Sequence, residues 1–136
     1  MKKFIPFVIV MLAANFKKAD SQKVYFQTDK LKYNATDSIK IKTTNKSTES
    51  LVYVIGLEIK IANKWEEIEG DIVNRVPKAE KWMVLKKNEN ITNSIVLPSY
   101  VVRNVKKNNA NLRFRLKYGL NVHTYNLIYS KTIIIR

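Results

Sequence analysis

The sequence predicts an all-β protein, a two-sheet antiparallel sandwich of about seven to eight short strands. In several runs, apolar residues recur at every second position, as they do in strands that bury one face. Polar turn sequences separate these runs at short intervals. No window longer than about ten residues shows the clean apolar repeat of a helix.

The first residues predict an export signal over residues 1–21. Lys2 and Lys3 precede an uncharged, mostly apolar run that covers residues 4–16. This run is shorter than the roughly 20 apolar residues that a membrane-spanning helix needs. We therefore expect a cleaved signal peptide helix and no transmembrane helix after cleavage.

The cleavage site defines the expected domain. Small residues at Ala19 and Ser21 favour cleavage before Gln22, and cleavage after Ala14 is the alternative. Residues 22–136 are then expected to form one domain, because about 115 residues bury enough surface for a core without disulfides. We expect this domain to be exported to the periplasm or the outside of a bacterial cell.

The composition excludes most catalytic designs. The chain has 136 residues, no cysteine and one histidine. This excludes cysteine nucleophiles, disulfides, iron–sulfur clusters, cysteine zinc sites and paired-histidine metal sites. We therefore expect a protein that is not an enzyme and holds no cofactor or metal. The net charge of +14, from 25 Lys plus Arg against 11 Asp plus Glu, makes an acidic polymer one partner class to consider.

The first half of the chain contains a weak strand pattern over 24–27 and two stronger ones. Residues 38–42 place two isoleucines on one face and two lysines on the other. The longest run covers residues 52–61, and the residues expected to point away from the core are Val52, Val54, Gly56, Glu58 and Lys60. Its expected inward residues are Tyr53, Ile55, Leu57, Ile59 and Ile61.

The turn after this run decides which face Trp65 occupies. A two-residue turn at Asn63-Lys64 would place Trp65 away from the face of Ile61, and a three-residue loop that starts at Ala62 would place it on that face. We expect the three-residue loop, because burial of an indole is worth about 2 kcal/mol.

The second half repeats the strand pattern. Residues 81–85 and 91–97 form weaker runs, and residues 112–118 alternate strictly between apolar and basic residues. A last run covers residues 122–135, and we expect an interruption around Asn126. Proline and the turn sequences favour loops over 71–80 and 98–111.

Short motifs along the chain resemble a known family. They are Tyr33, Asp37, Ile39, Ile41 and Asn45, then Glu58-Ile59 with Lys64–Ile68, then Leu112-Arg113, and finally Tyr129–Ile135. Together they resemble small secreted bacterial immunoglobulin-like β-sandwich domains, although the Gly and Tyr that precede this Arg in the family are absent. The resemblance implies an immunoglobulin-like fold and export, and it implies no activity.

The basic residues suggest an anion-binding surface. Arg113, Arg115 and Lys117 form a candidate basic face on one strand, and Lys40 and Lys42 lie on another. The alternative is that these are ordinary solvated positions, with lysine discouraging edge pairing. In an immunoglobulin-like sandwich the two strands belong to opposite sheets, so the five cations would form two patches.

One acidic cluster follows Trp65, namely Glu66, Glu67, Glu69 and Asp71. Paired carboxylates serve glycoside hydrolysis or bind Ca²⁺, but this run lacks the spacing and the turn glycine of a calcium loop. We expect an exposed hairpin that pairs with basic residues elsewhere.

His123 has no nucleophile motif beside it, so we expect it to lie on the surface. Aromatic residues in strands either line a carbohydrate platform or fill the core. The residues with these two alternatives are Tyr25, Phe26, Trp82, Phe114 and Tyr118.

The function expected is that of a non-catalytic binding module that engages a cell-envelope protein or glycan through loops at one end of the sandwich. The alternatives are a basic envelope protein that binds polyanions and an inhibitor of a hydrolase or protease. We expect no specific binding of nucleic acid, and the oligomeric state stays open. The candidate loop residues are Arg75, Pro77, Tyr100, Arg103, Lys106 and Lys107.

Overall fold

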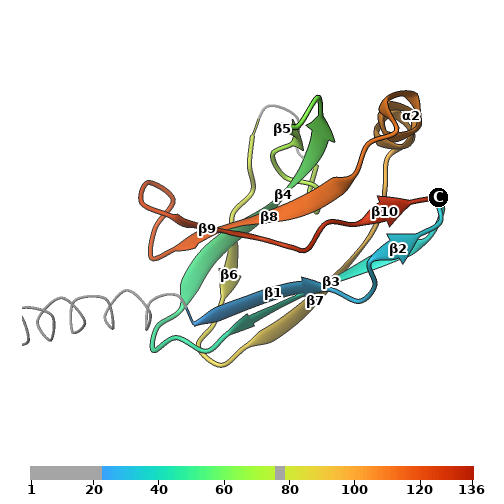
Figure 1. Ribbon diagram of the computed structural model, residues 1–136. Coiled ribbons are helices and arrows are strands. Elements are labelled where there is room, and N and C mark those ends of the chain that lie inside the picture. The colour runs from blue at the N-terminus through green and yellow to red at the C-terminus, as the bar shows by residue number, and fades with distance from the viewer. Residues whose placement is uncertain (1–22, 76–78) are drawn as a thin grey trace, which may run out of the picture.

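Strands dominate the structure, a computed structural model that describes residues 23–75 and 79–136 (Figure 1). The expected signal peptide and Pro77 lie outside the described residues. Within these ranges no helix has the length and apolar character needed to cross a membrane. The elements are β1 (Val24–Thr28), β2 (Lys32–Tyr33), β3 (Ser38–Asn45), β4 (Leu51–Ile61), β5 (Lys64–Glu69), β6 (Met83–Leu85), β7 (Asn90–Val96), α2 (Ser99–Asn108), β8 (Leu112–Gly119), β9 (Asn126–Tyr129) and β10 (Ile134–Ile135).

The strands form two antiparallel sheets, which confirms the predicted all-β sandwich. The three-stranded sheet has the order β1-β3-β7, and the five-stranded sheet has the order β5-β4-β8-β9, with β6 paired to the first residues of β4. The short strands β2 and β10 form a separate parallel pair. This partition of strands between sheets is that of an immunoglobulin-like sandwich.

The core lies between the two sheets, where alternate residues of each strand meet. Tyr53, Ile55, Leu57 and Ile59 of β4 are at most 3% exposed, as the sequence alternation predicts, and Ile61 is half-buried at the end of the strand. The largest fully buried side chains outside β4 are Tyr33, Ile39, Ile41, Ile72, Leu85, Leu112, Phe114, Leu116 and Tyr118. The core therefore draws on both sheets, as a sandwich requires.

The predicted loop over 98–111 is wrong, because most of it is the helix α2. Val101 and Val105 lie four residues apart, so they share one helix face and are buried against the core. Pro98 caps the start of the helix, and Asn109 ends it with a left-handed φ of 46°. Three valines in ten residues resemble a strand, and they concealed the helix from pattern analysis.

The β4–β5 connection is also different from the expectation. It is a two-residue turn of Ala62 and Asn63, and both have positive φ, 52° and 65°. This is the type I′ geometry, whose twist matches that of the strands it joins. We expected Trp65 on the face of Ile61, but it pairs with Lys60 and lies on the opposite, outer face.

The interruption expected around Asn126 lies further along the chain. Asn126 is the first residue of β9, and the break follows at Ser130. The Ser130 N–H donates to the Phe114 carbonyl at 2.9 Å, and the Ser130 hydroxyl accepts from the Phe114 N–H at 2.9 Å. A side-chain oxygen thus replaces a backbone carbonyl in the ladder, and the strand stops there.

A buried tyrosine fixes the path from β1 to β2. The Tyr33 hydroxyl donates to Asp29 Oδ1 at 2.6 Å and accepts from the Lys30 N–H at 2.8 Å. Burial and the bond to Asp29 raise the pKa of Tyr33 to about 12. Burial alone would raise the pKa of Asp29, but the hydrogen bonds from Tyr33 and from the Lys40 N–H outweigh it and lower that pKa.

We predict that the protein loses stability as the pH rises from 10.0 towards 12, because Tyr33 ionises more readily in the unfolded chain. Burial also raises the pKa values of Tyr53 and Tyr118, which adds to the same loss. The free energy of unfolding in urea, measured across this range beside the tyrosinate absorbance, tests the prediction. Tyr33→Phe should cost about 1–2 kcal/mol at neutral pH and should weaken the alkaline loss. A free energy that stays flat over the range would contradict it.

Candidate functional site

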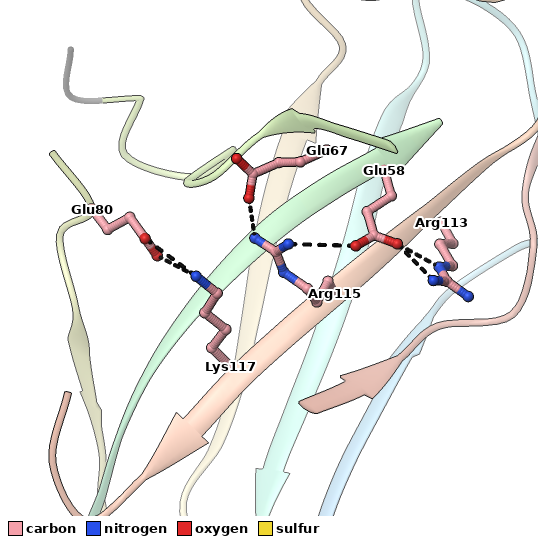
Figure 2. A network of polar contacts seen from close by, with 6 residues as sticks. All are labelled: Glu58, Glu67, Glu80, Arg113, Arg115 and Lys117. Atoms are coloured by element: carbon pink, nitrogen blue, oxygen red, sulfur yellow. Dashed lines mark hydrogen bonds and ion pairs between the residues drawn. The ribbon is translucent and has the colours of Figure 1, made fainter. Parts of the chain in front are cut away.

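A network of ion pairs covers part of the outer face of the five-stranded sheet (Figure 2). The register sets Glu58 of β4 directly beside Arg113 of β8, and Glu67 of β5 on the other side of Glu58. Arg113 Nη2 lies 2.7 Å from Glu58 Oε1. Arg115 Nη1 lies 3.4 Å from Glu58 Oε2, and Arg115 Nη2 lies 2.6 Å from Glu67 Oε1.

In this network the cations of the candidate basic face are already paired with carboxylates of the same chain. The alternation of β8 brings Arg113, Arg115 and Lys117 to one face, as predicted, but each cation has a carboxylate partner. Lys117 pairs with Glu80 at 3.3 Å, from the segment that precedes β6. The side chains of Arg115 and Glu58 are only 9% and 10% exposed. The three cations therefore form a paired network and not an open anion site.

Gly56 makes room for the most buried cation of the network. It lies opposite Arg115 in the β4–β8 ladder. A Cβ at Gly56 would lie 2.8 Å from Arg115 Nη2 and 3.0 Å from the Glu69 carbonyl oxygen. The guanidinium can therefore approach β4 this closely only because this position has no side chain.

Aromatic rings hold the neighbouring arginine from both sides. The Arg113 Cζ lies 4.3 Å from the Trp65 ring centroid and 3.7 Å from the Tyr129 ring centroid. Lys60 Nζ lies 5.8 Å from the Trp65 ring. These cation–π contacts compensate Trp65, which is half-buried, for its place outside the core.

A second group of aromatic and apolar side chains continues this face towards the β8–β9 loop. Lys117 Nζ lies 5.1 Å from the Tyr125 ring, and the Trp82 and Tyr125 ring centroids are 5.9 Å apart. Val84 and Leu127 are exposed on the same face, since they pair with the outward residues of β4 and β8. We name this surface the outer aromatic face: Trp65, Trp82, Val84, Tyr125, Leu127 and Tyr129.

The candidate loop residues are divided between two places. Arg75 is exposed in a turn closed by its own N–H, which donates to the Asp71 carbonyl at 3.1 Å. Tyr100 is half-buried on α2, where the basic residues are exposed. Figure 1 shows α2 near the C-terminus, at the end of the sandwich opposite the β8–β9 loop. The exposed basic residues of α2 are Arg103, Lys106 and Lys107.

The remaining sequence candidates have structural surroundings of their own. Lys40 and Lys42 are exposed on β3 in the three-stranded sheet, so they form a patch separate from β8. His123 is exposed, and its backbone N–H donates to Asn121 Oδ1 at 2.9 Å. Of the aromatic alternatives, Tyr25 is 62% exposed on β1. The other aromatic candidates are buried or half-buried: Phe26, Phe114 and Tyr118 lie in the core, and Trp82 is half-buried.

The acidic cluster disperses in the fold. Glu67 pairs with Arg115, which confirms the expected pairing of the hairpin with a basic residue. Asp71 is 4% exposed, and its Oδ2 accepts from the Lys81 N–H at 2.8 Å. Among residues 23–75 and 79–136, no group of three His, Cys, Asp or Glu residues is arranged to hold a metal ion.

Comparison with known proteins adds little to these observations. No protein-family model matches the chain, and no curated protein matches it. A β-glucosidase structure from Erythrobacter marinus is similar with a TM-score of 0.32 and 11% sequence identity, over 84% of this chain and 15% of that chain. The chain thus spans a small part of the length of that enzyme, and so slight a likeness carries no conclusion about activity.

We predict that Glu58→Gln lowers the free energy of unfolding by about 3 kcal/mol, because it leaves two arginines of the sheet without their shared carboxylate. Glu80→Gln is the matched control. Glu80 is 34% exposed and pairs with one lysine, so its loss should cost about 0.5 kcal/mol or less. Urea unfolding of both variants measures the difference, and equal costs would refute the structural role of Glu58.

We predict that Gly56→Ala lowers the free energy of unfolding by about 1–3 kcal/mol, because the new methyl group displaces the Arg115 guanidinium. Gly70→Ala is the control, since the nearest atoms to its added Cβ are 3.8 Å away. We expect that variant to change stability by about 0.5 kcal/mol or less. The same unfolding measurement applies, and a tolerated Gly56→Ala would show that the network relaxes freely.

Proposed function

We propose that this protein is a non-catalytic binding module that engages a protein partner through the outer aromatic face. One observation supports this above the others: the cations of β8 are paired with carboxylates, whereas aromatic and aliphatic side chains beside them stay open to solvent. Tyr125, Leu127 and Tyr129 are 43%, 46% and 39% exposed. Tyrosine, tryptophan and arginine dominate the energetics of protein interfaces, and free charges are depleted there.

The same contacts prepare this face for binding. Arg113 fixes the rings of Trp65 and Tyr129 from between them, and Lys117 lies over the ring of Tyr125. Side chains that are already ordered lose less entropy when a partner docks. The face therefore supports specific recognition better than the exposed lysines of α2 do, because those long side chains would each have to be ordered. The expected export signal leads us to propose a protein of the cell envelope as the partner.

We predict that a photo-cross-linking amino acid at Tyr125 or at Val84, introduced into the full chain in its producing cell, captures the same protein at low and at moderate ionic strength. Thr92 is the control position, because it is exposed on the three-stranded sheet. Gel electrophoresis and mass spectrometry of the adducts read out the result, and the Thr92 sample should lack the adduct.

Two results would overturn the proposal. Equal adducts from Tyr125 and Thr92 would show nonspecific contact. Capture that disappears between low and moderate salt would favour the polyanion alternative, because contacts to a charged polymer weaken steeply with salt. That alternative would then rest on the exposed cations of α2 and β3.

A further inference from the structure

The strand β9 has one free edge in the described structure. It pairs with β8 on one side, and the five-stranded sheet ends there. Further along the same chain segment, β10 is covered on the corresponding side by β2, in parallel pairing of Ile134 with Lys32. Beside β10 this side is occupied by β2, whereas beside β9 no strand of the described residues pairs on it.

The hydrogen-bond pattern shows which backbone groups face this open line. Ser130 N–H donates to the Phe114 carbonyl, so Ser130 belongs to a bonded pair with β8. In an antiparallel ladder bonded pairs alternate with non-bonded pairs. The backbone groups of Leu127 and Tyr129 therefore point away from β8, towards the open side. An edge of this kind is a template for an added strand.

A groove runs beside this edge, between β9 and β1, with a volume of about 440 Å³. Phe26, Leu31 and Tyr129 give it an apolar lining. Leu31 is 49% exposed and Tyr129 39% exposed, so both are available to an occupant. Lys30 and Lys131 line the same groove and are exposed.

The charges around the groove favour an acidic occupant. The carboxylate in the lining is that of Asp29, and its Oδ1 already accepts hydrogen bonds from the Tyr33 hydroxyl and the Lys40 N–H. The ionised Asp29 offsets one of the two lysines, so the lining of Asp29, Lys30 and Lys131 keeps a net positive charge. A second copy of this chain would bring its own Lys30 and Lys131 to a shared edge, and each copy carries a net charge of +14. Like charges therefore oppose pairing between copies.

We propose that an extended, acidic segment of the partner protein adds to the edge of β9 as a further strand, with apolar side chains in the groove and carboxylates near Lys30 and Lys131. This inference rests on the proposed function and names how the partner binds. Main-chain hydrogen bonds to Leu127 and Tyr129 supply the affinity, and the groove supplies the selectivity.

The test uses the full chain and two labelled peptides. One alternates valine with glutamate, and the other alternates valine with lysine. We expect the acidic peptide to bind about tenfold more tightly by fluorescence anisotropy, and amide exchange at Leu127 and Tyr129 to slow about tenfold when it binds. Equal binding of the two peptides, or slowed exchange confined to other residues, would overturn the inference.

Variants of the edge separate backbone pairing from side-chain contact. Leu127→Pro removes an N–H that faces the open side, and it should weaken peptide binding about tenfold. Leu127→Ala keeps that N–H and should weaken binding about threefold or less. If Leu127→Pro fails to fold, the double variant Lys30→Glu with Lys131→Glu takes its place and should prefer the lysine peptide. An unchanged preference, or a dimer that forms through this edge in ultracentrifugation, would overturn the inference.

The outcome also distinguishes the two proposals. If neither peptide binds while Tyr125 still captures a partner, the strand-addition inference fails and the proposed function stands. If capture from the outer aromatic face fails as well, both fail.

Discussion

The carboxylate of Glu58 is the contact on which the outer face of the five-stranded sheet depends. It lies between two guanidiniums that sit on one face of β8 because they are two residues apart. Each guanidinium then makes a second contact, since Arg113 separates the rings of Trp65 and Tyr129 while Arg115 reaches a carboxylate of β5. Side chains thereby join four strands that the backbone ladder also joins, and the aromatic rings acquire fixed positions.

This arrangement changes the meaning of the net charge. A total of +14 invites the interpretation of a polyanion binder. The most regular basic stretch of the sequence is β8, and its cations nevertheless form ion pairs with Glu58, Glu67 and Glu80. Charges in a partly buried network are worth more to the fold than to a ligand, because a ligand would have to replace contacts that are already made. Beside this network lie exposed aromatic and aliphatic side chains and the free edge of β9.

Local sequence patterns failed where a tertiary contact outweighed a local preference. Trp65 was expected inside because an isolated indole gains most from burial, but the type I′ turn at Ala62 and Asn63 sets it outside, where an arginine from a distant strand stacks on it. Proline and the turn sequence predict a loop where α2 forms, because three valines in ten residues hide the helical repeat. Burial of Val101 and Val105 against the core decides for the helix.

The sequence by itself determined the fold class, the inward residues of β4, the alternation of β8 and the lack of a cysteine-based or paired-histidine centre. These follow from composition and from a two-residue period, which are local properties of the chain. Only the tertiary structure decided that Glu58 meets Arg113, that Gly56 leaves room for Arg115, and that the edge of β9 stays open. The first two features depend on the register between β4 and β8, which pairs residues as far apart in the chain as Glu58 and Arg113, 55 positions from each other. No local pattern encodes that register.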